Sequence, residues 1–208
     1  MKGLFITLEG GEGSGKTTVS HLVIQQLGHQ GIEAVYTREP GGIPIAEKIR
    51  EVILDPKHLE MDARTEALLY AAARRQHLVE KVVPALEAGK IVICDRFIDS
   101  SVAYQGHARQ LGIEEIWDIN QFATEGMLPD LTIFFDVDPE IGLGRICADA
   151  NRHVDRLDLE GIGFHKNVYQ GYQDQAARFP QRIKTVDASQ TLEKVVDEVS
   201  KIIRCALK

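Results

Sequence analysis

The segment from Gly10 to Thr17 carries the strongest chemical signal in the chain. It fits the phosphate-binding pattern G-x-x-x-x-G-K-[ST] at every fixed position. Glycines let the backbone curl until successive N–H groups point inward, and the dipole of the following helix also attracts an anionic polyphosphate. Lys16 would then bridge the β- and γ-phosphates, and the Thr17 hydroxyl would face Mg²⁺. The predicted nucleotide-binding residues are Gly11, Glu12, Gly13, Ser14, Gly15, Lys16, Thr17 and Thr18.

Charged residues follow two other predicted strands. Arg38 and Glu39 come directly after the strand at 33–37, and Asp95 and Arg96 come directly after the strand at 90–94. Ligands of open α/β sheets bind at the carboxyl ends of the strands, and arginine suits bidentate capture of phosphate. We therefore expect a phosphate site here. Asp95 competes with Asp136, at the end of a later strand, for the role of the acid that holds Mg²⁺ through water.

Two pairs of residues are spaced i, i+4 on predicted helices, so each pair shares one helix face. Tyr70 and Arg74 form the first pair, in which a ring could stack on a planar base while the guanidinium donates to it. Ser101 and Gln105 form the second, and Gln105 could pair with a base edge. A core tyrosine beside a surface arginine, and a capping or surface glutamine, are open alternatives on spacing alone.

A charged stretch without apolar periodicity interrupts the helices near the middle of the second half of the chain. It contains Arg152 and Arg156, and we expect it to form a short lid over about 149–159. Because Lys16 is the only basic residue of the phosphate loop, a mobile lid arginine could bring the missing charge to a transferring phosphoryl group. A solvated helix face is the alternative.

Hydrophobic patterning sets the fold that must position these residues. Buried strands are expected at 4–8, 33–37, 90–94, 131–135 and 183–186. Helices are expected between and after them, including a long one over 63–87 whose last turn Pro84 should kink. Alternation of strands and helices predicts an α/β protein, a P-loop NTPase-like three-layer sandwich with a five-stranded parallel sheet, in a single domain over residues 1–208.

Composition narrows the function classes. A net charge of −7 argues against a protein that coats nucleic acid. No apolar run approaches the roughly 20 residues needed to cross a bilayer, and the first residues enter a strand without a signal-like segment. Three widely spaced cysteines suit reduced thiols better than disulfides or a zinc site. We therefore expect a cytoplasmic protein with neither a membrane nor a nucleic-acid partner.

Four longer motifs now give the chain a family resemblance. They are Phe5-Ile6-Thr7-Leu8-Glu9-Gly10, Thr37-Arg38-Glu39-Pro40-Gly41-Gly42, Asp95-Arg96-Phe97-Ile98-Asp99-Ser100-Ser101 and Pro129-Asp130-Leu131-Thr132. In this order they resemble the bacterial thymidylate kinase family from end to end. The resemblance implies transfer of the γ-phosphoryl group of ATP to dTMP, with Mg²⁺, in a homodimer. Arginines in the lid rather than the phosphate loop make the chain similar to the lid-arginine type.

The resemblance also implies roles for individual residues. Arg38, Arg50 and Arg96 would surround the acceptor phosphate, Asp95 would orient these groups and the water shell of the metal, and Glu12 would accept from the deoxyribose 3′-hydroxyl. Tyr70 would stack on thymine, Arg74 would reach its O4, Ser101 and Gln105 would contact its polar edge, and Tyr104 would crowd the 2′ position. The catalytic set would comprise Lys16, Glu39, Asp95, Arg96, Arg152 and Arg156, with Thr17 and Asp95 at the metal.

The chain departs from the family pattern at two positions. Tyr70 stands where phenylalanine is frequent, which keeps the stacking face, and Phe97 stands where tyrosine is frequent, which loses a hydroxyl. Two rival functions remain open. A deoxynucleoside kinase would need Glu39 or Asp95 as a base for a neutral 5′-hydroxyl, and a P-loop switch would hydrolyse ATP slowly without any small acceptor.

Overall fold

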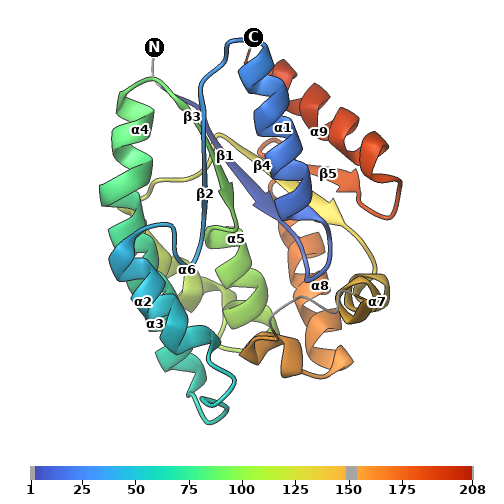
Figure 1. Ribbon diagram of the computed structural model, residues 1–208. Coiled ribbons are helices and arrows are strands. Elements are labelled where there is room, and N and C mark those ends of the chain that lie inside the picture. Colours follow the sequence, from blue (N-terminus) through green and yellow to red (C-terminus); the bar gives the residue numbers. More distant parts are fainter. Residues whose placement is uncertain (1–2, 149–153, 208) are drawn as a thin grey trace.

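The fold is built around one sheet of five parallel strands. The computed structural model describes residues 3–148 and 154–207. The strands are β1 (Phe5–Glu9), β2 (Ala34–Arg38), β3 (Ile91–Asp95), β4 (Leu131–Asp136) and β5 (Ile183–Asp187). Their order across the sheet is β2-β3-β1-β4-β5, so β1 lies in the centre (Figure 1). The predicted five-stranded parallel sheet is confirmed, and both ends of each strand lie within one residue of the predicted position.

Helices cover both faces of this sheet, because successive strand residues point to opposite sides. On one face Ile6 and Leu8 pack with apolar residues of α1 (Lys16–His29) and α9 (Leu192–Ala206). On the other face Phe5 packs against the segment Leu78–Glu87, and Phe134 packs against α8 (Ile162–Arg178). The result is the predicted three-layer α/β/α sandwich.

Apart from α1, α8 and α9, the described helices lie at the carboxyl ends of the strands or, like α4, against a face of the sheet. They are α2 (Pro44–Leu54), α3 (Ala63–His77), α4 (Val83–Glu87), α5 (Ile98–Ser101), α6 (Ile113–Thr124) and α7 (Pro139–Ala148). Asp62 caps α3 as its side chain accepts from the backbone N–H groups of Arg64 and Thr65. Pro44 begins α2, where its missing N–H costs nothing.

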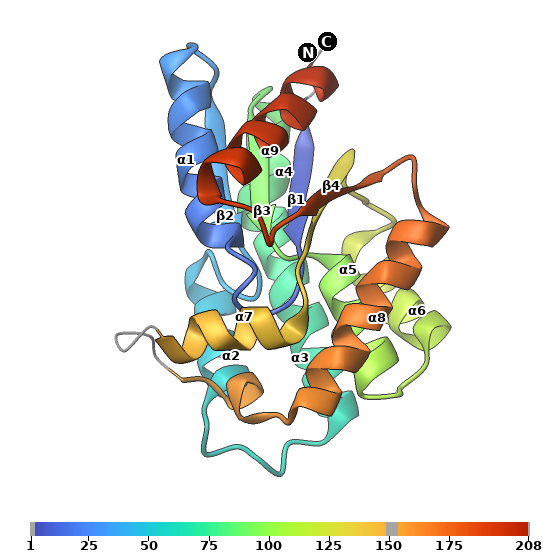
Figure 2. The same cartoon turned by 90° about the vertical axis from the view of Figure 1, so that its right-hand side faces the viewer.

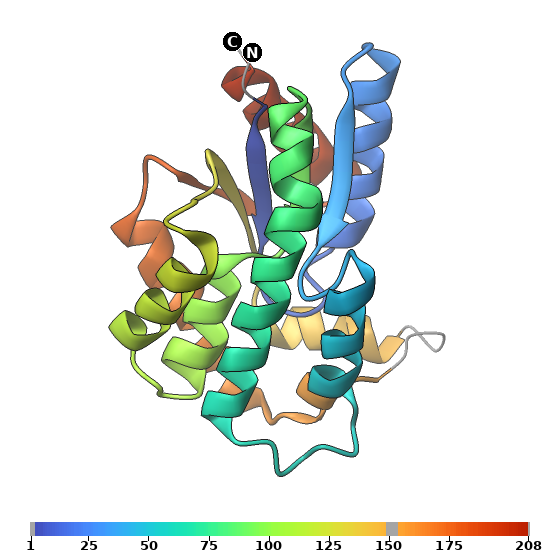
Figure 3. The same ribbon diagram turned by 90° about the vertical axis from the view of Figure 1, so that its left-hand side faces the viewer.

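The predicted long helix over 63–87 is present but not uniform. Between α3 and α4 the chain forms a wider π-helical turn, η1 (Leu78–Val82), and the three segments run on as one rod (Figure 3). Proline removes an intrahelical hydrogen bond and clashes with the carbonyl four residues earlier, which here belongs to Glu80. The irregularity therefore lies in the turn before Pro84, one turn earlier than the kink that the sequence predicts.

A second π-helical segment, η2 (Val102–Ala108), continues α5, so the predicted short helix near 100–104 is longer than expected. It packs closely against α8. Helix α7 crosses the carboxyl ends of the strands beside the loop that precedes α1 (Figure 2). The predicted lid overlaps residues 149–153, which lie outside the described part of the chain. Its remaining residues include a short 3₁₀ turn, η3 (Arg156–Leu159).

Candidate active site

The phosphate loop joins β1 to α1 at the centre of the sheet. Gly15 adopts a left-handed conformation, with φ of 87°, immediately before α1, and this turn aims the first N–H groups of the helix back toward the loop. The ammonium of Lys16 donates to the carbonyls of Gly10 and Gly11 and to Ser14 Oγ, at 2.9–3.0 Å. Burial, together with the nearby charge of Arg96, lowers the pKa of Lys16 to about 8. The loop thus holds a buried cation within a ring of backbone dipoles.

The candidate metal site lies at the mouth of this loop. Thr17 Oγ1 donates to Asp95 Oδ2 at 2.8 Å, although the two residues are 78 positions apart. A hydroxyl and a carboxylate are the hard oxygen ligands that Mg²⁺ prefers, so the donor set fits this ion. Asp136 is instead bound by the hydroxyl of Tyr169 at 2.7 Å. Of the two competing acids, Asp95 is therefore the one beside Thr17.

Arg96 lies above the loop in an unusual backbone conformation, with φ of 70°. This turn directs its guanidinium across the phosphate loop, where Nη2 donates to Glu12 Oε1 at 2.5 Å and Nη1 donates to the carbonyl of Gly10 at 3.1 Å. Its charge also lies over the ring of Tyr104, 5.0 Å from the centroid. Non-glycine residues with a left-handed backbone are strained, and they persist only where the surrounding structure holds them in place. Such residues cluster at functional sites.

Glu9 holds the segment that follows Arg96 in place, and it was not among the predicted site residues. Its carboxylate accepts from the backbone N–H of Phe97 at 2.7 Å, from Ser100 Oγ at 2.5 Å and from the hydroxyl of Tyr172 at 3.1 Å. Burial, reinforced by Asp99, raises the pKa of Glu9 to about 7. Its place at the end of β1, directly before the glycine loop, was a usable signal, since α/β sites lie at strand ends.

A cleft of about 530 Å³ opens over the phosphate loop. Several predicted site residues line it, namely Glu12, Gly13, Ser14, Gly15, Lys16, Thr17, Thr18, Arg38, Glu39, Arg50, Tyr70, Asp95 and Arg96. Arg145 and Asp155 also line it and were not predicted. Arg145 donates to the carbonyls of Gly13 and Ala188 at 3.4 and 3.0 Å, so α7 supplies a cation at the phosphate loop itself. Its position seven residues before Arg152 was the available signal.

A second, smaller cavity of about 20 Å³ adjoins the cleft and shares Glu39, Tyr70, Arg96 and Leu157 with it. Its other lining residues are Arg74, Ser100, Ser101, Tyr104 and Gln105, so all the residues predicted to contact a base meet there. The Tyr104 hydroxyl donates to Glu12 Oε1 at 3.0 Å, which ties this cavity to the phosphate loop.

Arg74 is fixed before any ligand arrives. It is 2% exposed, and its guanidinium donates to Glu39 Oε2 at 2.7 Å, to Ser101 Oγ at 2.9 Å and to the carbonyl of Phe97 at 2.9 Å. Asn120 Oδ1 on α6 accepts a further hydrogen bond from it. A buried guanidinium with four of its five N–H donors engaged has little freedom to reorient, so this arginine has one orientation at the cavity wall.

These features can be compared with those of known proteins. The family model described as Thymidylate kinase matches residues 8–199. The chain belongs to the thymidylate kinase family. A thymidylate kinase of Oceanobacillus iheyensis is 63% identical over 203 residues, covering 98% of this chain and 90% of the relative. One of Bacillus licheniformis is 59% identical over 208 residues, covering 100% and 98%.

A solved structure of thymidylate kinase from Ehrlichia chaffeensis has the same fold, with a TM-score of 0.79 and 34% identity, covering 98% of this chain and 99% of that one. Membership of the thymidylate kinase family makes the chain a nucleoside monophosphate kinase, a phosphotransferase. The resemblance inferred from the four motifs is thereby confirmed. Within the parts of the chain that the structure describes, no helix has both the length and the apolarity to traverse a bilayer.

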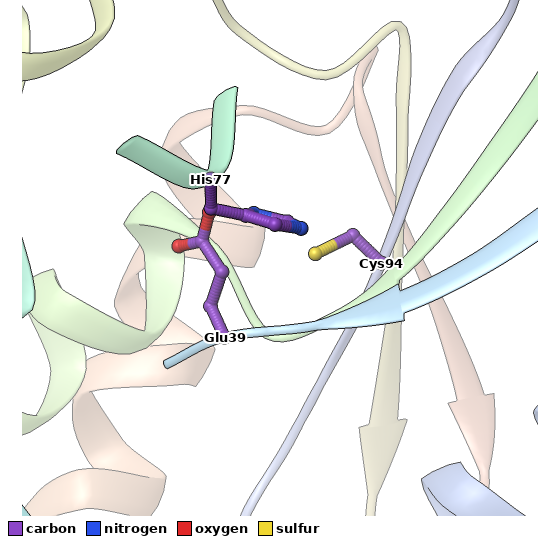
Figure 4. A group of neighbouring side chains, drawn as sticks. All are labelled: Glu39, His77 and Cys94. Carbon is purple, nitrogen blue, oxygen red and sulfur yellow. The ribbon is translucent and has the colours of Figure 1, made fainter. Parts of the chain in front are cut away.

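The motif Thr37–Gly42 contributes Glu39 to a buried cluster with His77 and Cys94 (Figure 4). Spacing along the sequence does not reveal this cluster. His77 Nδ1 donates to Glu39 Oε1 at 2.8 Å, and its Nε2 pairs with Thr37 Oγ1 at 2.6 Å. Burial raises the pKa of Cys94 well above its ordinary value, and the thiol donates to the carbonyl of Arg96. Since Arg74 takes the other Glu39 oxygen, the cluster is a hydrogen-bonded support for the site of this kinase.

The structure describes only one of the two predicted lid arginines. Arg152 lies outside the described residues. Arg156 is buried, donates through Nε to the carbonyl of Ile53 at 2.8 Å and through Nη2 to Glu66, and does not line the cleft. Glu66 and Ile53 thus hold the guanidinium of Arg156 away from the cleft lining, and its contact with a transferring phosphoryl group stays a prediction. Glu66 itself was missed, although it precedes Tyr70 by one helical turn on the same face.

Proposed function

We propose that the chain transfers the γ-phosphoryl group of ATP to dTMP, giving dTDP and ADP. The observation that carries this function is the junction of two cavities. A cleft over the phosphate loop meets a smaller cavity lined by Tyr70, Arg74 and Gln105, and Arg96 lies at the boundary between them. A nucleoside triphosphate in the first and a nucleoside monophosphate in the second would meet phosphate to phosphate at Arg96.

Charge supplies the chemistry at this junction. The acceptor is itself an oxyanion, so no strong general base is required, and catalysis rests on positioning and on neutralising the charge of the transferring group. Lys16 and Arg96 provide cations on the two sides of that group. Arg38 and Arg50 line the same cleft, in which Arg38 pairs with Glu47 and Arg50 donates to the carbonyl of Pro40.

We assign Mg²⁺ to Thr17 and Asp95. Thr17 and Asp95 would hold the ion, which would supply positive charge to offset the negative charge of the phosphates. The protein's own contribution is to hold the hydroxyl and the carboxylate 2.8 Å apart. Because Thr17 is the second residue of α1 and Asp95 is the last residue of β3, secondary structure fixes both ligands.

Recognition of the base falls to the smaller cavity. Tyr70 would stack on thymine, Arg74 would donate to its O4, and Ser101 and Gln105 would contact its polar edge. Tyr104, held by Glu12, would leave no room for a 2′-hydroxyl, while Glu12 would accept from the 3′-hydroxyl. Glu39, whose two oxygens are engaged by Arg74 and His77, acts as a positioning residue for Arg74.

The same contacts weigh against a deoxynucleoside kinase. Such an enzyme needs a carboxylate free to take a proton from a neutral 5′-hydroxyl. Glu39 is 4% exposed and paired on both oxygens, and Asp95 accepts from Thr17. Neither acid is placed as a base.

The proposal includes a homodimer and a cytoplasmic location. Helical segments α3, η1 and α6 each carry an exposed apolar side chain. These are Leu68 at 57%, Val79 at 42% and Phe122 at 88% exposure. Helices α3 and α6, which carry Leu68 and Phe122, pack against each other. Exposed apolar patches of this kind mark association sites.

ADP release from Mg-ATP tests the function, with dTMP, dUMP, dCMP, dGMP, AMP and thymidine as acceptors and a control without acceptor. We expect strong release with dTMP, weaker release with dUMP and background with the others. Preference for thymidine would favour the nucleoside kinase. Release indifferent to every acceptor would favour the P-loop switch.

A further inference from the structure

One buried carboxylate behind the smaller cavity joins three helical segments. Glu66, on α3, is 1% exposed. Its Oε1 accepts from Gln105 Nε2 of η2 at 2.8 Å, and its Oε2 accepts from Arg156 Nη2 of η3. Arg109 donates to both oxygens at 3.3–3.4 Å. Glu66 is not among the residues that line the cleft or the smaller cavity, so its partners define its role.

The contact with Glu66 determines which way the Gln105 amide points. An ionised carboxylate only accepts hydrogen bonds, so the NH₂ branch of Gln105 must face it. The Oε1 branch then faces the other way, and among residues 3–148 and 154–207 no group donates a hydrogen bond to that atom. Gln105 is 1% exposed and lines the small cavity beside Tyr70 and Arg74. An acceptor on a cavity-lining side chain that has no donor partner points to a donor on the ligand.

Two arginines keep Glu66 in the acceptor-only form. Burial alone would raise the pKa of Glu66, but the hydrogen bond from Gln105 and the charges of Arg109 and Arg156 bring it below its ordinary value. Reversing the Gln105 amide would set its carbonyl oxygen against an anionic oxygen in a buried space. That reversal would leave the Gln105 NH₂ without the partner it has here, which is costly in a dry site.

We propose that Glu66 is a specificity-positioning residue, which locks Gln105 with its carbonyl oxygen toward the base and so selects a pyrimidine that carries a ring N–H. Thymine and uracil offer N3–H as a donor to this oxygen, whereas cytosine offers an unprotonated N3 that would repel it. This inference rests on the proposed function, and it assigns the discrimination against cytosine to a residue that does not touch the substrate.

Glu66→Gln tests the lock with almost no change of shape. Arg109 and Arg156 would donate to the single carbonyl oxygen of the new amide, so its NH₂ group would face Gln105. That NH₂ group would favour the reversed orientation of the Gln105 amide. We expect kcat/KM for dTMP to fall and the ratio of kcat/KM for dCMP to that for dTMP to rise roughly tenfold. Glu66→Asp keeps an acceptor-only group and should keep a ratio near that of the wild type.

Arg109→Met is the matched control, because it removes one charged partner of Glu66 while Arg156 still holds the carboxylate ionised and facing Gln105. Its dCMP to dTMP ratio should equal that of the wild type. An unchanged ratio in Glu66→Gln, or an equal rise in Arg109→Met, would overturn the lock. A wild-type protein that phosphorylates no pyrimidine monophosphate would instead overturn the proposed function, so the two failures are distinct.

A measurement on the wild-type protein covers the case in which Glu66→Gln does not fold. The side-chain NH₂ resonances of Gln105, assigned by their loss in Gln105→Met, report the orientation directly. We expect slow hydrogen exchange of these protons in the free protein and little change when dTMP binds, since they remain on Glu66. Rapid exchange in the free protein, with strong protection on binding of dTMP, would contradict the proposal.

Discussion

At the scale of single residues, the site works with ionisable groups whose charge depends on burial. Burial of Lys16 and the nearby charge of Arg96 both favour its neutral form, and together they lower its pKa to about 8. Glu9 shows the opposite case, in which burial raises the pKa of a carboxylate to about 7. Each group is poised to change charge near neutral pH when an anion arrives or leaves.

The Lys16 shift predicts proton uptake when a nucleotide binds. In the free protein Lys16 is charged below pH 8 and increasingly neutral above it, while bound phosphates favour the charged form. Affinity for Mg-ATP should therefore fall as the pH rises through about 8. Calorimetry at pH 8.5 in two buffers of different ionisation enthalpy should show uptake of most of one proton, and Lys16→Met should abolish it. Equal uptake in both proteins would assign the proton elsewhere.

At the scale of elements, the phosphate loop depends on its contact with α7. Gly142 of that helix lies so close to the loop that an added Cβ would stand 2.3 Å from the carbonyl oxygen of Glu12. Gly13 meets the same contact from the other side, with φ of 67° and a hypothetical Cβ 2.0 Å from the carbonyl oxygen of Gly142. The helix that carries Arg145 to the cleft is thus positioned by two facing glycines.

Two alanine variants on α7 separate this contact from helix propensity. Gly142→Ala should lower the free energy of unfolding by ~1–3 kcal/mol, because the loop must shift to admit the methyl group. Gly144→Ala meets open space and should raise it by about 0.5–1 kcal/mol. Urea denaturation measures both. Equal behaviour of the two variants would show that the close approach has no energetic weight.

Arg156 gives a second prediction for an element, the turn η3. Its guanidinium anchors η3 to Glu66 and to the carbonyl of Ile53, while the neighbouring Leu157 lines the base cavity. Arg156→Met should therefore raise KM for dTMP several-fold, through loss of buried hydrogen bonds worth ~1–3 kcal/mol, with a smaller effect on KM for ATP. Steady-state kinetics with each substrate varied in turn decides this. A fall in kcat alone would contradict this prediction and would support the contact of Arg156 with the transferring phosphoryl group that the sequence predicts.

The elements also show what sequence can and cannot predict. Strands β3 and β4 were predictable because they are continuous apolar runs that a parallel sheet buries on both faces. The meeting of Thr17 with Asp95 follows from the rule that the carboxyl ends of strands meet at one edge. The pairing of Glu66 with Arg156, and of Glu39 with His77, could not be predicted, because it depends on how helices pack rather than on spacing along one helix.

At the scale of the whole molecule, helices α3 and α6 carry large apolar side chains that no described part of the single chain covers. Phe122, on α6, is 88% exposed, and Leu68 on the adjacent α3 is 57% exposed, whereas the apolar faces of α1 and α9 pack against the sheet. Arg75 and Glu125 form an ion pair between α3 and the end of α6, near this surface. An apolar face with charged residues beside it is the form that an association surface takes.

A charge placed on that face tests the proposed homodimer. Phe122→Glu should convert the protein to a monomer in sedimentation velocity, because burying the new carboxylate in an apolar interface is costly. Its secondary structure should be unchanged, since the side chain is exposed in the single chain. Leu192→Glu, at a 47% exposed position on α9, is the matched control and should leave the oligomeric state unaltered. A wild-type protein that sediments as a monomer would refute the dimer.

The most direct test of the central claim is single-turnover transfer from ATP labelled at the γ-phosphate, with enzyme in excess and Mg²⁺ and dTMP present. If the two cavities meet at Arg96 as described, the label should pass to dTDP with almost none in inorganic phosphate, and Arg96→Met should slow this transfer by orders of magnitude. Label released as inorganic phosphate at the same rate with and without dTMP would contradict the account.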